Sequence, residues 1–147
     1  MLESISWPSD SATFTIYCDA CPFGMGFWHP GLMVRFYSPT PEDVHPDLIF
    51  YFEALCVLCA LRDTCSKSSL PSRFIIYTNN LNTVDIFSSL SALPAYNILL
   101  REAVNLLMAG HHDLRVLHVN GEENTVADAL SQANFPWAFE LQLQLQD

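Results

Sequence analysis

The stretch 14–28 constrains the fold most, because it combines two strand patterns with a carboxylate between them. Residues 13–19 alternate as one strand that ends on Asp19, and Gly24 and Gly26 open a second strand. A charge at the tip of an apolar strand is costly unless water, a polar partner or a metal contacts it. We therefore expect Asp19 to be the first ligand of a metal centre whose other ligands come from later segments.

The remaining pattern predicts a single α/β domain. A turn at 29–31 leads to a third strand over 32–37, which completes an antiparallel meander. Helical spacing and apolar runs then predict helices at 47–65, 82–90, 94–109 and 125–132, and strands at 73–78 and 113–119. Three antiparallel strands followed by alternating helices and strands predict a mixed five-stranded sheet with helices on both faces.

The domain is expected to span residues 13–132, after a polar lead-in at 1–12. Residues 133–147 form an apolar tail whose last part alternates with period two, which suits either a strand added to a partner or a disordered remnant.

Composition places the chain inside the cell, in the cytoplasm or nucleus. A length of 147 residues that are 50% hydrophobic suits one domain with a real core. No apolar run reaches the roughly 18 residues of a membrane span, and the N-terminus does not resemble a signal peptide. Five cysteines without a secretory context are expected to be reduced thiols.

The charge balance runs against a stand-alone nucleic-acid binder. Sixteen acidic residues against six basic ones give a net charge of −10. Proteins that bind nucleic acid usually carry a basic surface. Either the substrate is not a polyanion, or neighbouring domains of a larger polypeptide supply the positive charge, or binding has been lost.

Further acids lie on separate predicted elements. Glu53 lies within the long helix and Asp128 within the last helix, while Thr78-Asn79-Asn80 ends the fourth strand where another acid is expected. Carboxylates that converge from separate elements are suitable ligands for Mg²⁺ or Mn²⁺. Two such ions about 3.5–4 Å apart promote phosphodiester hydrolysis.

Several segments resemble one family. The most specific is the final motif, His118-Val-Asn-Gly-Glu-Glu-Asn-Thr-Val-Ala-Asp-Ala-Leu-Ser-Gln132. Tyr17-Cys-Asp19 with Gly24-Met-Gly26, Glu53-Ala-Leu55 and Ile76-Tyr-Thr-Asn-Asn80 resemble the family's other motifs. Over residues 13–132 the chain resembles the ribonuclease H domain of a retroelement reverse transcriptase, of the gypsy-like or tyrosine-recombinase type.

The resemblance implies hydrolysis of the RNA strand of RNA–DNA hybrids, with two Mg²⁺ or Mn²⁺ ions as cofactors and flanking reverse transcriptase domains as partners. It implies catalytic and metal-binding roles for four positions, namely Asp19, Glu53, Asn79 and Asp128. Asn79 stands where the family has aspartate, by natural decay or by engineering, and Gln132 replaces the usual arginine. Activity is therefore expected to be weakened or abolished, and the alternative is an inactive scaffold or interaction module with the same fold.

Two further motifs compete with this interpretation. Cys18-x-x-Cys21 and Cys56-x-x-Cys59 are two pairs of the kind that form tetrahedral zinc sites, although 34 residues separate them. Within an apolar helix, cysteine more often serves as a small hydrophobic residue. His118 suggests a proton shuttle, but it lies in the strand before the loop that carries this histidine in cellular and retroviral enzymes.

Overall fold

The computed structural model describes residues 13–30, 34–40, 49–68, 70–89 and 94–145. Its first part is an antiparallel meander of β1 (Thr13–Cys21), β2 (Gly24–His29) and β3 (Val34–Pro39). The two-residue link between β1 and β2 sets a register in which Asp19 lies opposite Gly26. The predicted lead-in, residues 1–12, lies outside the described residues.

The second part of the sheet is parallel, as predicted. β4 (Arg73–Thr78) and β5 (Asp113–His118) complete a five-stranded sheet in the order β3-β2-β1-β4-β5. β4 pairs in parallel with both β1 and β5. Its sequence, Arg-Phe-Ile-Ile-Tyr-Thr, has the β-branched and aromatic content of a central strand.

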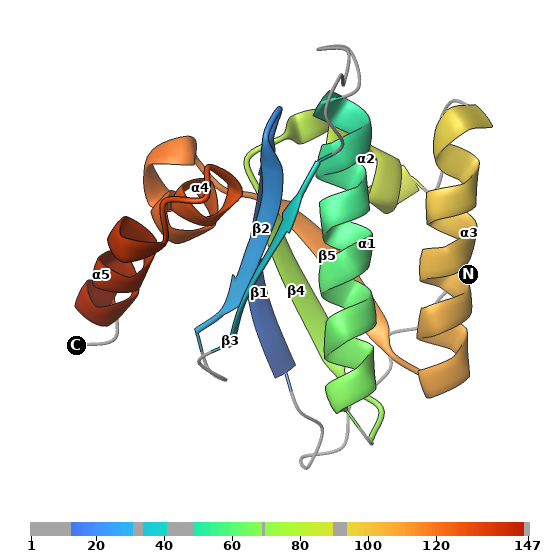
Figure 1. Cartoon of the computed structure of the whole chain (residues 1–147). Coiled ribbons are helices and arrows are strands. Elements are labelled where there is room, and N and C mark those ends of the chain that lie inside the picture. The colour runs from blue at the N-terminus through green and yellow to red at the C-terminus, as the bar shows by residue number, and fades with distance from the viewer. Residues whose placement is uncertain (1–12, 31–33, 41–48, 69, 90–93, 146–147) are drawn as a thin grey trace.

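Helices cover both faces of this sheet (Figure 1). Helices α1 (Ile49–Lys67) and α3 (Pro94–Gly110) pack together on one side. Helices α4 (Thr125–Ser131) and α5 (Phe135–Leu145) lie on the other side, and α2 (Leu81–Ser89) packs near β5. The alternation of β1 divides the core, since Ile16 and Cys18 join the α1 cluster whereas Tyr17 packs against the α4 cluster.

The C-terminal helix corrects the prediction for residues 133–147. Their period-two pattern suggested a strand or a disordered remnant, but Phe135–Leu145 is helical. Ala138 is fully buried against α4, and Leu141 packs on the same cluster. Tertiary contact with α4 therefore outweighs the alternation of apolar and polar residues that is typical of a strand. In the resulting helix, the side chains of Trp137 and Phe139 are about half exposed.

Two glycines of β2 allow α4 to approach the sheet closely. A Cβ on Gly26 would lie 2.5 Å from Cβ of Leu130 and 2.8 Å from the backbone nitrogen of Ser131. A Cβ on Gly24 would lie 2.7 Å from the carbonyl oxygen of Ser131. Since backbone atoms are among those contacted, side-chain rotation cannot relieve the overlap, and α4 would have to move.

Gly26→Ala is accordingly expected to destabilise the fold by about 1–3 kcal/mol, the usual cost of overpacking a tight interface. Chemical denaturation of both proteins measures the difference. Gly121→Ala is the matched control, because a Cβ there would lie 3.6 Å from Asn79, at ordinary contact distance. A loss at Gly121 as large as that at Gly26 would contradict the packing explanation.

Candidate active site

The candidate site lies where β1 continues past the end of its pairing with β4. The parallel register runs from Thr13 opposite Arg73 to Tyr17 opposite Tyr77, whereas β1 extends to Cys21. Beyond this point the carbonyl oxygen of Cys18 accepts a buried hydrogen bond of 2.7 Å from Nδ2 of Asn124. Open α/β sheets commonly bind ligands at the carboxyl ends of their strands. The end of β1, where it is no longer paired with β4, is a position of this kind.

Asp19 lies at the centre of the site and is 3% exposed. Its Oδ2 accepts a hydrogen bond of 3.1 Å from the hydroxyl of Ser131. Burial first, and then the adjacent charge and hydrogen bond of Asp128, together raise the pKa of Asp19 from its ordinary value to about 7. Asp19 and Asp128 are therefore direct neighbours, although 109 positions separate them in sequence.

Glu53 reaches the same place from α1 and is 5% exposed. Burial first, and then the negative charge of Asp19, raise its pKa to about 8. Hydrogen bonds from the backbone of Ala20 and the side chain of Thr78 act in the opposite direction. Its Oε2 is buried and has no hydrogen-bond partner in the structure, which is an energetically costly state for a carboxylate oxygen.

The other two predicted residues are exposed. Asp128 lies on α4, where its Oδ1 accepts a hydrogen bond of 3.1 Å from Nε2 of Gln132. Asn79 follows β4, and its Nδ2 lies beside Gly121 of the short η2 helix (Gly121–Glu123). The structure thus brings Asp19, Glu53 and Asp128 together through Asp19, and places Asn79 at the adjacent strand end.

The donor atoms suit a hard divalent cation in kind. The acids offer carboxylate oxygens, and the partnerless Oε2 of Glu53 is a buried acceptor of the type that a cation satisfies. Among the described residues, however, no group of three or more histidines, cysteines, aspartates or glutamates is arranged to hold a metal ion. Asn79, whose side chain is an uncharged amide, is not a member of such a group.

All four cysteines of the two pairs lie among the described residues, and they are not arranged as a zinc centre there. Cys18 and Cys56 are buried in the core, and the Cys56 thiol donates to the carbonyl oxygens of Asp19 and Gly26 at 3.5 and 3.4 Å. His118, exposed at the end of β5, lies opposite Thr78.

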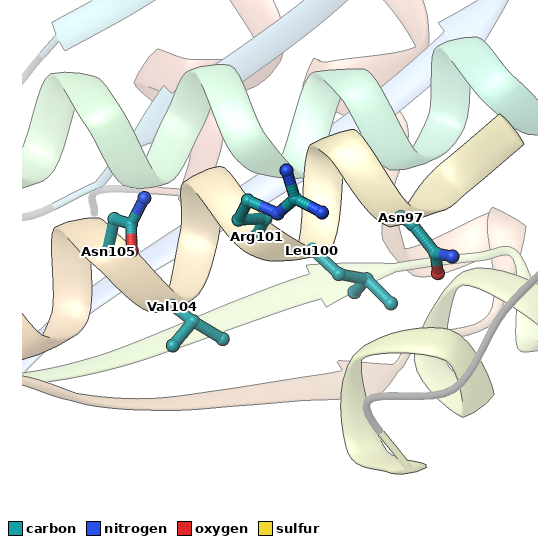
Figure 2. Close-up of a pocket in the computed structure, with 5 residues that line it drawn as sticks. All are labelled: Asn97, Leu100, Arg101, Val104 and Asn105. Carbon is teal, nitrogen blue, oxygen red and sulfur yellow. The ribbon is translucent and has the colours of Figure 1, made fainter. Parts of the chain in front are cut away.

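A pocket lies away from this site, along α3. It has a volume of about 330 Å³, and Figure 2 shows its lining side chains, which are Asn97, Leu100, Arg101, Val104 and Asn105. None of these residues belongs to the acidic site. In the described part of the chain, no helix has the length and apolar character needed to cross a membrane.

Neither a protein-family model nor a curated protein matches the sequence. Solved structures do match the fold. The LC11 ribonuclease H1, in complex with an RNA/DNA hybrid, aligns with a TM-score of 0.64 at 16% identity, over 80% of this chain and 92% of that one. The chain has a ribonuclease H-like fold.

Two further ribonucleases H agree with this assignment. The N-terminal ribonuclease H domain of a Mycobacterium tuberculosis protein, fused to maltose-binding protein, gives a TM-score of 0.64 at 15% identity. This alignment covers 93% of the present chain and 100% of the Mycobacterium tuberculosis chain. Ribonuclease H1 from Halobacterium salinarum aligns with a TM-score of 0.63 at 13% identity, over 84% of this chain and 99% of that chain. The predicted fold class is confirmed.

Three buried residues of the candidate site were not predicted from sequence, namely Thr78, Asn124 and Ser131. All three are polar residues with no surface exposure or almost none, and each contacts β1 or a residue of the site. Only their positions in the sequence could have indicated them. Thr78 directly precedes Asn79, and Asn124 and Ser131 lie in the final motif, which also contains Asp128.

Proposed function

We propose that the chain is the ribonuclease H domain of a reverse transcriptase from a gypsy-like or tyrosine-recombinase-type retroelement. It hydrolyses the RNA strand of RNA–DNA hybrids with a divalent metal, and Asn79 weakens this activity. The observation that carries the proposal is the position of Asp19 at the carboxyl edge of the sheet, where it hydrogen-bonds Asp128 and its charge acts on the buried Glu53. The hybrid bound to the LC11 ribonuclease H1 supports the choice of substrate.

In this mechanism Asp19, Glu53, Asp128 and Asn79 are the residues that would hold the cofactor, Mg²⁺ or Mn²⁺. When bound, the metal ions supply an activated water and offset charge on the scissile phosphate. Glu53, whose pKa is about 8, keeps its proton at neutral pH in the absence of a metal, and it would have to lose this proton to bind a cation. Asn79 contributes an amide oxygen without charge, so it binds a cation less tightly than the aspartate of the family.

Recognition of the hybrid depends on groove shape and 2′-hydroxyl groups, which are sequence-independent features of such duplexes. A net charge of −10 opposes the approach of a polyanion. Flanking domains of the same intracellular polypeptide therefore supply the positive charge that holds the substrate.

A second candidate is a non-catalytic domain of the same fold that acts as a scaffold or interaction module. The uncharged Asn79 and the net charge of −10 favour it. Gln132 favours it as well, since this residue donates a hydrogen bond to Asp128 and carries no positive charge. The two candidates differ in one measurable property, the cleavage of a hybrid by the unmodified chain.

The test is cleavage of a labelled RNA–DNA hybrid in Mg²⁺ and in Mn²⁺, compared between the unmodified chain and Asp19→Asn. We expect slow cleavage of the RNA strand that Asp19→Asn lowers by on the order of 100-fold or more, because a charged ligand is lost. Equal traces of cleavage in both proteins would indicate a contaminant. Absence of cleavage in both, with a folded chain, would support the non-catalytic module.

A further inference from the structure

The buried hydroxyl of Ser131 connects two of the site's acids. Ser131 is the last residue of α4 and is 0% exposed. Its Oγ lies 3.1 Å from Oδ2 of Asp19 and 2.8 Å from the carbonyl oxygen of Asp128. It is therefore in contact with the carboxylate at the centre of the site and with the backbone that carries the second acid.

The backbone around Ser131 is fixed from several sides. Its carbonyl oxygen accepts a hydrogen bond of 3.1 Å from the thiol of Cys21. The absence of side chains at Gly24 and Gly26 lets the end of α4 contact β2 directly. These contacts hold the Ser131 backbone against β1 and β2, so the position of the hydroxyl depends on χ1 alone.

A serine hydroxyl has one hydrogen, and the two acceptors compete for it. The carbonyl oxygen of Asp128 also accepts the backbone N–H of Gln132, at 3.2 Å, and so keeps a partner without Ser131. An ionised carboxylate is the stronger acceptor of the two. When Asp19 is charged, as it is when it binds a cation, the hydroxyl therefore donates to its Oδ2.

We propose that Ser131 is a positioning residue that fixes the rotamer of Asp19 by holding Oδ2, alongside the hydrogen bonds of Asp19 with Asp128 and with the backbone of Ala20, and so orients the carboxylate for a cation. The metal-binding part of this inference rests on the proposed function, whereas the rotamer part depends on the hydrogen bond alone. Ser131 itself lies outside the four predicted metal-binding positions.

The direct test is the side-chain rotamer of Asp19, measured by NMR couplings from Cγ to the backbone nitrogen and carbonyl carbon. We expect one rotamer in the unmodified chain and averaging over several in Ser131→Ala. Ser131→Cys, which retains a weak donor and most of the volume, is expected to show averaging as well. Ser131→Thr, which retains the hydroxyl, is expected to restore the single rotamer.

Ser66→Ala is the matched control. Ser66 lies near the end of α1 and donates to the carbonyl oxygen of Asp63 at 2.6 Å, which is the same three-residue spacing as between Ser131 and Asp128. Its removal tests the loss of a helix-end hydroxyl remote from the acids. A single Asp19 rotamer in both Ser131→Ala and Ser131→Cys would overturn the proposal, and so would a failure of Ser131→Thr to restore it.

Metal binding provides the second readout, by calorimetric titration with Mn²⁺ in the Asn79→Asp background. We expect Ser131→Ala to weaken binding about tenfold, the usual lower range for residues that orient a ligand. Unchanged affinity alongside a disordered Asp19 would overturn the metal-binding part of the inference. Absence of Mn²⁺ binding in the background itself would count against the proposed function, and the rotamer result would still decide the role of Ser131.

Discussion

Asn79→Asp is expected to raise Mn²⁺ affinity and hybrid cleavage by on the order of 100-fold. Two opposite unit charges about 4 Å apart attract by roughly 4 kcal/mol at an effective dielectric constant of 20; the divalent charge of Mn²⁺ doubles this attraction, and desolvation offsets most of the gain. Asn79 is exposed at the end of β4, next to the buried Thr78 whose side chain bonds Glu53, so a carboxylate at position 79 adds negative charge one residue from a partner of Glu53 and requires no rearrangement of the core. Calorimetry with Mn²⁺ and cleavage of a labelled hybrid measure the two effects.

The neighbouring residue offers a matched control. Asn80→Asp adds the same charge one position later, but its Oδ1 accepts the backbone N–H of Thr83 at 2.9 Å at the start of α2. Aspartate preserves this helix cap, so the fold is unaffected. Equal gains from Asn79→Asp and Asn80→Asp would show that net charge, rather than a new ligand, produces the effect.

Glu53→Gln is expected to stabilise the fold in the absence of divalent cations while abolishing metal binding. Burial and Asp19 raise the pKa of Glu53 from 4.5 to about 8. Between these values the unfolded chain releases a proton that the folded chain retains, so the free energy of unfolding falls as pH rises through this window, by up to about 1.4 kcal/mol per unit. The neutral amide of the variant does not titrate, so this decrease in the free energy of unfolding is absent from it. Glu53→Gln is therefore expected to raise the free energy of unfolding by about 2–3 kcal/mol at pH 7.

Urea denaturation in chelator at pH 5, 7 and 9 measures this effect. The difference between Glu53→Gln and the unmodified chain is expected to be small at pH 5 and to increase toward pH 9. Glu140→Gln serves as the control, because Glu140 is exposed on α5 and such surface changes usually stay within about 0.5 kcal/mol. A gain from Glu53→Gln that did not change with pH would point to packing instead of the retained proton.

The elements with strong local patterns were predicted from sequence. The bounds of β4 agree with the prediction at both ends, because Phe74 and Ile76 belong to a continuous apolar run between polar loops. The convergence of Asp19, Glu53 and Asp128 was suggested by their places on separate elements. It was specified by the resemblance of the final motif rather than by spacing.

Other features depend on tertiary contacts that no local pattern contains. The hydroxyl of Ser131 and the amide of Asn124 act on residues 112 and 106 positions away. The requirement for glycine at position 26 comes from the backbone of α4, and the helicity of α5 accompanies the burial of Ala138 against α4. In each case the deciding partner is remote in sequence, so it becomes visible in the fold alone.

The long sequence separation between β1 and α4 also orders the events of folding. Contacts across more than 100 residues carry the largest loop-closure entropy and form after the local helices. During synthesis, at about 5–20 residues per second, β1 and α1 leave the ribosome many residues before α4 does. The side chains of Asp19 and Glu53 therefore remain solvated and ionised until α4 has been synthesised. Docking of α4 is the step that brings Asp128 and Ser131 to Asp19 and completes the surroundings that raise the pKa of this carboxyl.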